Sequence, residues 1–292
     1  MAKTRKLRKG VTKKEKPCLI PTREELNNPP NTLEDYVIAL FGEKGIGKTT
    51  LASQFDDFLV CMWEPGRRNL KVRQFPYKPG QKLTYAVQKE IIQQGCKDPT
   101  IKGFAIDTID RLYNAAVEEM CFDRGISSPS EMNDFGALWR EIRDDVEATL
   151  SIPREYGKGL ILLSHAKEKE LETASGDKYC RVVPTCGNAA FEIMKAMCDY
   201  AWYYGFVGKK RCLQLRGDDH IWSACGVSDH FQDSIRTNED GDPMDLERIY
   251  LPSPKSAYKL LLAAFNNELT EQIEGEEETP KKKKKKLKRI AV

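Results

Sequence analysis

The feature that most constrains this chain is a glycine-rich octapeptide, Gly42 to Thr49, which reads Gly-Glu-Lys-Gly-Ile-Gly-Lys-Thr. It fits the pattern G-x-x-x-x-G-K-S/T, whose glycines let backbone N–H groups turn inward and cradle phosphate oxygens. In that pattern Lys48 supplies a positive charge for the β- and γ-phosphates, and the Thr49 hydroxyl binds Mg²⁺. The predicted phosphate contacts are Gly42, Glu43, Lys44, Gly45, Ile46, Gly47, Lys48, Thr49 and Thr50.

The residues around the octapeptide predict its structural context. Tyr36 to Phe41 is an apolar run of strand length, and Thr50 to Phe55 has helical character. A buried strand before the loop and a helix after it are what the motif requires. The alternative is an ordinary glycine turn that happens to carry a lysine. The dinucleotide fingerprint G-x-G-x-x-G does not fit, because the glycines fall at 42, 45 and 47.

Composition narrows the class of protein further. The chain has 292 residues and 40% hydrophobic content, enough to bury one substantial α/β core with a small appendage. No apolar stretch approaches the length of a membrane span, and the basic N-terminus lacks the apolar segment of a secretory signal. Nine cysteines without C-x-x-C pairs indicate reduced thiols. We therefore expect a cytoplasmic protein with no membrane partner.

Charge is concentrated at the two ends of the sequence. Residues 1–16 carry a net charge of about +7, and residues 281–292 carry about +8. Because the whole chain carries +3, the residues between them carry about −12. We expect disordered tails at 1–17 and 271–292 around a folded domain at 18–270. The tails are either solvated segments or non-specific contacts to nucleic acid phosphates.

Apolar runs of strand length alternate with helical segments from about residue 35 to about residue 200. Further strands are expected at 59–63, 104–106 and 160–163, and the helices include 108–122 and about 131–151. This alternation predicts an α/β fold with a mostly parallel sheet flanked by helices. A small β-rich C-terminal extension should follow. It would contain strands at 201–206 and 211–215 and a last helix from Pro254 to about Asn267, with Ser253 as its N-cap.

An acid at the end of a strand marks a second element of the predicted site. Asp107 ends the run Gly103 to Ile106, and a carboxylate there, beside a phosphate loop, holds Mg²⁺. Many buried strands also end in Asp without binding metal. Asp110 lies one turn further on and either assists or caps the following helix.

Two other strand ends carry polar residues. Glu64 follows the expected strand 59–63, and Ser164 and His165 follow the strand 160–163. The carboxyl ends of parallel strands share one edge of a sheet, so these side chains should lie near the nucleotide. Glu64 is the candidate that aligns water for hydrolysis, and Ser164 with His165 is the candidate sensor of the γ-phosphate. A solvent-facing acid and a structural histidine are the alternatives.

These residues together resemble the RecA-type ATPase core. More narrowly, the chain is similar to small phage-encoded RecA-like nucleotide-binding proteins of the single-strand annealing or recombination type. Beyond the phosphate loop, the resemblance rests on four stretches within about residues 36–205: Trp63–Gly66, Phe104–Asp110, Gly159–His165 and Cys198–Tyr200. It implies ATP and Mg²⁺ as cofactors, with Lys48 and Thr49 at the phosphates, Asp107 at the metal and Glu64 at the water.

The resemblance also implies partners. It indicates an ATPase that acts on single-stranded DNA in phage or viral recombination, replication or repair, in the host cytoplasm if the chain is phage-encoded. A homo-oligomer and single-strand binding or other replication proteins are implied partners. The segment Ala166–Cys186 corresponds to a mobile DNA-binding loop, and Lys167, Lys169 and Arg181 are candidates to complete a neighbouring subunit's site. Met62, where the family commonly has an acid, and Arg216–Asp242 depart from the pattern.

Two further groups of residues allow more than one interpretation. A basic loop interleaved with aromatic residues suits single-stranded nucleic acid but also fits an ordinary exposed loop. Its members are Arg67, Arg68, Lys71, Arg73, Phe75, Tyr77, Lys78 and Lys82. Cys212, His220, Cys225 and His230 are zinc-ligand types, but their spacing fits no compact finger, so chance is the favoured explanation.

Two other functions stay open at this stage. One is a nucleotide-regulated DNA-binding or annealing protein with little ATP turnover. The other is a small-molecule kinase, which requires an acceptor pocket for which the sequence offers no lid-like arginine cluster.

Overall fold

The computed structural model describes residues 30–64, 70–173, 175–226 and 229–269. The chain divides into two compact units, Met1–Asn31 and Thr32–Val292, and every helix and strand described below belongs to the second. The predicted tails, 1–17 and 271–292, lie outside the described residues. The domain limits at residues 18 and 270 therefore stay predictions.

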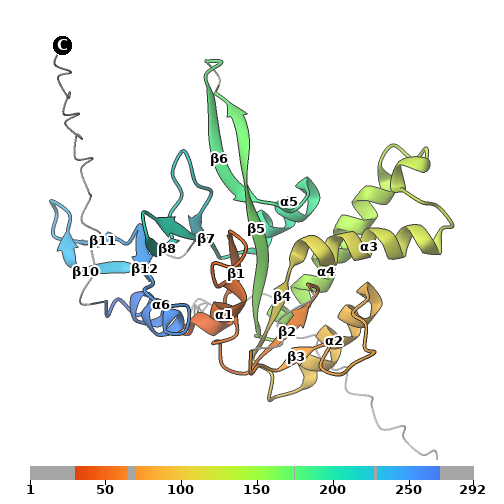
Figure 1. Ribbon diagram of the computed structural model, residues 1–292, viewed down its shortest axis with the longest axis horizontal. Helices are drawn as coiled ribbons and strands as arrows, with labels where there is room; N and C mark the ends of the chain where they lie inside the picture. The colour runs from red at the N-terminus through yellow and green to blue at the C-terminus, as the bar shows by residue number, and fades with distance from the viewer. Residues whose placement is uncertain (1–29, 65–69, 174, 227–228, 270–292) are drawn as a thin grey trace, which may run out of the picture. The chain divides into compact units, whose positions relative to one another are not determined.

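A central sheet runs through the second unit in the strand order β12-β8-β7-β1-β5-β4-β2-β3 (Figure 1). The six strands from β7 to β3 pair in parallel, whereas β8 and β12 add an antiparallel edge. The predicted α/β fold with a mostly parallel sheet is thus confirmed. The bounds of these strands are β1 Val37–Gly42, β2 Phe58–Met62, β3 Gln74–Phe75, β4 Gly103–Asp107, β5 Gly159–Glu172, β7 Tyr200–Val207, β8 Lys210–Gln214 and β12 Arg248–Tyr250.

Four further strands lie off this path. Strands β6 (Lys178–Pro184) and β9 (Ala224–Cys225) pair antiparallel with β5 and β7, respectively. Strands β10 (Gln232–Thr237) and β11 (Pro243–Asp245) form a separate two-stranded sheet. The strands expected in a C-terminal extension, 201–206 and 211–215, are β7 and β8, which belong to the central sheet, and β9 to β12 follow them in the described residues.

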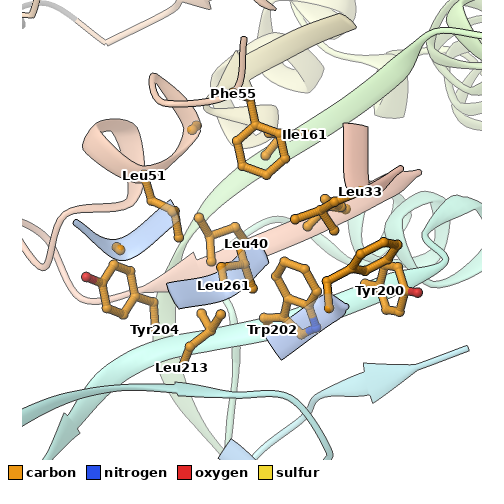
Figure 2. Packing of buried hydrophobic residues seen from close by; sticks show 14 of the residues in the cluster. Leu33, Leu40, Leu51, Phe55, Ile161, Tyr200, Trp202, Tyr204, Leu213 and Leu261 are labelled. Carbon is orange, nitrogen blue, oxygen red and sulfur yellow. The ribbon is translucent and has the colours of Figure 1, made fainter. Parts of the chain in front are cut away.

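Helices cover both faces of the sheet. Ile38 and Leu40 of β1 pack into one apolar cluster with α1 and α6, as Figure 2 shows for Leu40, Leu51 and Leu261. Val37 and Ala39 pack into a second cluster with α2, α3, α4 and α5. Successive strand residues point to opposite faces, so burial on both sides explains why β1 is apolar throughout. The helices are α1 Lys48–Ala52, α2 Tyr85–Lys97, α3 Ile109–Asp123, α4 Ala137–Glu155, α5 Asn188–Met197 and α6 Ala257–Phe265, with short 3-10 turns at Leu33–Asp35 and Pro129–Glu131.

Two helix starts differ from the sequence expectation. Helix α4 begins at Ala137 instead of residue 131, because the Asp134 carboxylate accepts the N–H groups of residues 136, 137 and 138. Helix α6 begins at Ala257 with Ser256 as its N-cap, so the prediction of Ser253 was wrong. The Pro254 carbonyl and the Tyr258 N–H, which would bond in a first turn at 254, both bond the Gln54 side chain instead.

The segment Ala166–Cys186 was expected to be a loop, and this was wrong as well. Strand β5 continues seven residues past His165 and pairs with β6 from Ala166↔Pro184 to Glu172↔Lys178. The two strands form a ribbon that extends beyond the sheet (Figure 1). A paired ribbon satisfies the backbone groups that a loop would leave to water. None of the helices in the described ranges is long and apolar enough to cross a membrane.

Candidate nucleotide-binding site

The candidate site lies where the parallel strands reach their carboxyl ends. Gly42 ends β1 and pairs with His165 of β5, while Asp107 ends β4 and pairs with Met62 of β2. The octapeptide leads from Gly42 into α1, whose first residue is Lys48. The topology thus brings residues from four strands and one helix to a single edge.

Two of these residues form a direct contact. The Thr49 hydroxyl donates a hydrogen bond to Asp107 Oδ2 at 2.7 Å, and both side chains are buried. Hydroxyl and carboxylate oxygens are the ligand types that Mg²⁺ prefers. The donor set therefore fits a magnesium ion, which Thr49 and Asp107 would hold. The sequence predicted both residues for this role, and the structure places them together.

Lys48 is buried beside the phosphate loop, with only 6% of its surface exposed. Its Nζ donates to the carbonyl oxygens of Gly42 at 2.8 Å and Glu43 at 2.9 Å. It also lies 3.3 Å from His165 Nδ1. A buried ammonium requires such partners, because an unpaired buried charge is costly. Lys48 is therefore held at the loop, where the motif places its charge.

His165 connects Lys48 to Glu64. Its Nε2 lies 2.8 Å from Glu64 Oε1, and the two side chains are 26% and 25% exposed. An ammonium group can only donate, so Nδ1 accepts from Lys48 and Nε2 carries the hydrogen that Glu64 accepts. The Glu64 backbone is also fixed, since its N–H donates to the Asp107 carbonyl at 3.2 Å. Three predicted site residues are thus connected in the order Lys48, His165, Glu64.

Ser164 points away from these three residues. Its hydroxyl donates to Asp110 Oδ2 at 2.8 Å, and Thr185 donates to Asp110 Oδ1 at 2.6 Å. Neighbouring residues of a strand face opposite sides, so Ser164 and His165 have different surroundings. Asp110 does not cap α3, whose N-cap is Thr108. It joins the start of α3 to Ser164 of β5 and to Thr185, the residue after β6. No sequence pattern had marked Thr185 as a site residue.

The opposite side of the phosphate loop contacts β7, β8 and the turn before α6. A Cβ on Gly42 would lie 2.0 Å from the Tyr204 carbonyl oxygen, so only glycine fits at the end of β1. Gly47 has φ +121°, and a Cβ there would meet Pro254 at 3.0 Å. Arg211 Nε donates to the carbonyl oxygen of Ile46 at 3.2 Å. None of these three contacts was predicted from the sequence.

Two further candidate groups were predicted from the sequence, the basic loop and a set of four zinc-ligand types. Of the basic loop, Arg67 and Arg68 are outside the described residues, and Arg73 is paired with Asp98 at 3.0 Å. Tyr77 is 62% exposed, with Lys78 over its ring. Within the described ranges, no group of three or more His, Cys, Asp or Glu residues could hold a metal. Cys212, His220, Cys225 and His230 therefore form no zinc cluster there.

The parallel sheet and the phosphate loop, with Thr49 against Asp107, define a P-loop NTPase. The chain belongs to the AAA domain family, whose profile matches residues 34–223. That span includes every residue of the predicted site, from Gly42 to His165.

Solved structures that align with the chain include a KaiC-like protein from the hyperthermophilic archaeon Pyrococcus horikoshii OT3. It is 16% identical, with a TM-score of 0.38, over 64% of this chain and 80% of that chain. The RadB recombinase is 14% identical, with a TM-score of 0.40, over 76% of this chain and 89% of that chain. At these scores neither likeness bears on activity or partners. No curated protein matches the chain.

Proposed function

We propose that the protein binds ATP with Mg²⁺ at residues 42–49 and Asp107, and hydrolyses it. The observation that carries this proposal is the 2.7 Å contact between the Thr49 hydroxyl and Asp107, directly after the phosphate loop. Thr49 and Asp107 would hold the Mg²⁺ ion, which would offset the negative charge of the phosphates when bound. Lys48, on the same loop, places a positively charged side chain beside the phosphates.

Glu64 is the proposed group that aligns the attacking water. The water oxygen bonds to the γ-phosphorus, the bond from that phosphorus to the β–γ bridging oxygen breaks, and a water proton passes to the Glu64 carboxylate. The products are ADP and inorganic phosphate. His165 is a positioning residue, since its Nε2–H holds the Glu64 carboxylate.

The contact between Lys48 and His165 offers a path from nucleotide to ribbon. A phosphate that attracts the Lys48 ammonium competes with His165 Nδ1 for that donor. His165 is the last residue of β5 before the ribbon begins at Ala166. Loss or gain of the γ-phosphate would therefore change the contacts of His165, the residue directly before the ribbon. Ser164 would contribute through Asp110, which bonds both Ser164 and Thr185.

The ribbon is the proposed contact to DNA. Its register pairs Lys169 with Arg181, Lys167 with Val183 and Leu171 with Tyr179. Because strand residues alternate between faces, these residues share one face, while Glu168, Glu170 and Glu172 lie on the other. We call the first the basic face. It combines cations with Tyr179, a ring on which an unpaired base can stack, and so favours single-stranded DNA.

We also propose an oligomeric state, a biological role and a cellular location for the protein. We place the protein in phage or viral recombination, replication or repair, in the cytoplasm of the host, as a homo-oligomer that works with single-strand binding or other replication proteins. Lys167, Lys169 and Arg181 are the residues that a neighbouring subunit would offer to the site. The two basic tails would add non-specific attraction to DNA.

A second function is favoured by one observation. The Glu64 carboxylate already accepts a hydrogen bond from His165, which leaves it less available to orient water. If that bond persists with ATP bound, the protein is a nucleotide-regulated DNA-binding or annealing protein with little turnover.

The test is the rate of ATP hydrolysis with no DNA, with single-stranded DNA and with duplex DNA. We expect hydrolysis that single-stranded DNA stimulates more than duplex does. ATP binding without hydrolysis under all three conditions supports the second function. Phosphate transfer to a small acceptor, without any effect of DNA, would identify a kinase instead and contradict the proposal.

A further inference from the structure

A cationic side chain lies against the phosphate loop on the side away from the magnesium residues. In the sheet order β4-β5-β1-β7-β8, strand β1 and its loop separate two groups of residues. Asp107 and His165 belong to β4 and β5 on one side. Arg211 belongs to β8 on the other, and its Nε reaches the Ile46 carbonyl at 3.2 Å. The loop is therefore flanked by functional groups on both sides.

Arg211 is held in place by two contacts. The register pairs it with Phe206 of β7, and its guanidinium carbon lies 5.3 Å from the centre of the Phe206 ring. These contacts use Nε and one face of the guanidinium plane. Within the described part of the chain, the two terminal nitrogens, Nη1 and Nη2, have no hydrogen-bond or ion-pair partner. The guanidinium is thus fixed in orientation while two of its nitrogens keep their donors.

The charge of Arg211 also affects Tyr204, which lies beside the phosphate loop. Burial raises the pKa of the Tyr204 phenol, and the positive charge of Arg211 opposes that rise. The Tyr204 ring lies 3.6 Å from the position that a Cβ on Gly47 would take. Arg211 and Tyr204 therefore both adjoin the backbone whose N–H groups face the phosphates in this motif.

We propose that Arg211 is a phosphate-binding residue supplied by the same chain, and this inference rests on the proposed function. A guanidinium binds phosphate oxygens through paired donors, and Nη1 and Nη2 provide them. Lys48 contacts His165 on the β5 side of the loop, so Arg211 supplies a second cation on the β8 side. This position is away from Glu64, and Arg211 therefore binds the phosphates that ADP retains.

The position predicts a specific kinetic signature. Loss of the Arg211 charge should weaken ADP and ATP to the same extent and raise the KM for ATP. The rate at saturating ATP should stay unchanged, because the contact is equal before and during the reaction. A cation that touched the cleaved phosphate would instead lower that rate.

The test compares three variants in full-length protein. Arg211→Gln keeps an N–H donor for the Ile46 carbonyl but removes the charge. Arg211→Lys keeps the charge without the fork. Lys210→Ala, on the same strand, removes one exposed charge next to Arg211. The dissociation constants of Mg-ADP and Mg-ATP are measured by calorimetry at low and high salt.

We expect Arg211→Gln to weaken both nucleotides by about tenfold and to reduce the salt dependence, since a hydrogen bond to a charged group is of that strength. Arg211→Lys should recover part of the loss, and Lys210→Ala should bind as wild type does. Unchanged binding in Arg211→Gln overturns the inference. The inference is also overturned if Arg211→Lys binds both nucleotides as weakly as Arg211→Gln does, because Arg211 then has a purely structural role. Wild-type protein that binds neither nucleotide contradicts the proposed function itself.

Discussion

His165 donates from Nε2 to Glu64 Oε1 across 2.8 Å, while its other ring nitrogen lies 3.3 Å from Lys48 Nζ. One imidazole thus connects the candidate base to the lysine of the phosphate loop. Glu64 lies two residues after the end of β2, and Lys48 is the first residue of α1, which follows β1. His165 lies on β5, which stands between β1 and β2 in the sheet order, and it connects both residues into one network.

The first prediction concerns this imidazole. In His165→Ala, Glu64 loses its donor, and ATP hydrolysis should fall by about 10- to 100-fold because a base held loosely aligns water poorly. ATP affinity should change much less, since the loop itself is intact. His165→Gln, whose amide can donate to Glu64, should retain more activity than His165→Ala. Steady-state rates and nucleotide affinities check this. Equal activity in all three proteins would remove His165 from the account.

The second prediction concerns the magnesium residues. Thr49→Val keeps the shape of the side chain but removes the hydroxyl that contacts Asp107, whereas Thr49→Ser keeps the hydroxyl. We expect Thr49→Val and Asp107→Asn to lose at least about tenfold in Mg-ATP affinity, and Thr49→Ser to bind nearly as wild type does. Titrations with Mg²⁺ and with EDTA measure this. If EDTA lowers the ATP affinity of Asp107→Asn as strongly as it lowers that of the wild type, the metal is held elsewhere.

The third prediction tests the basic face of the ribbon. Lys169→Ala and Lys178→Ala each remove one exposed lysine, but the register places them on opposite faces, and Lys178 is paired with Glu170 at 2.7 Å. Lys169→Ala should weaken single-stranded DNA binding several-fold and reduce the slope of log K against log salt by about 0.7. Lys178→Ala should do neither. Fluorescence anisotropy over a range of salt concentrations distinguishes the faces, and equal effects would reject the assignment.

The fourth prediction concerns stability at the phosphate loop. Gly42→Ala places a methyl group 2.0 Å from the Tyr204 carbonyl oxygen, so backbone must move, and we expect a loss of more than about 2 kcal/mol. At Gly45, with φ +84°, a Cβ meets nothing within 4 Å, and only the backbone conformation is disfavoured, by about 1–2 kcal/mol. Urea unfolding measures both. A smaller loss for Gly42→Ala than for Gly45→Ala would contradict the packing described here.

The sequence predicted what is encoded locally. The phosphate loop, the strand before it and the acid at Asp107 each depend on a few neighbouring residues, and the structure contains β1, the loop and β4 at those places. The strand order then brings Asp107, Glu64 and His165 to one edge, as the parallel arrangement implies. The roles of these residues stay predictions until they are measured.

Contacts between distant segments could not be read from the sequence. Thr185 reaches Asp110 because β6 pairs antiparallel with β5, and no local pattern marks that pairing. Arg211 reaches Ile46 because β8 lies beyond β7 in the sheet. The start of α6 was misplaced for the same reason, since Gln54 takes both groups of its expected first turn.

The central claim is that Mg-ATP binds at the phosphate loop and that Glu64 aligns the water that cleaves it. Single-turnover hydrolysis by Glu64→Gln, with Mg-ATP affinity measured on the same protein and single-stranded DNA present, tests this most directly. We predict affinity within about threefold of wild type and ADP formation at least about 100-fold slower. Hydrolysis at the wild-type rate in Glu64→Gln would contradict the account.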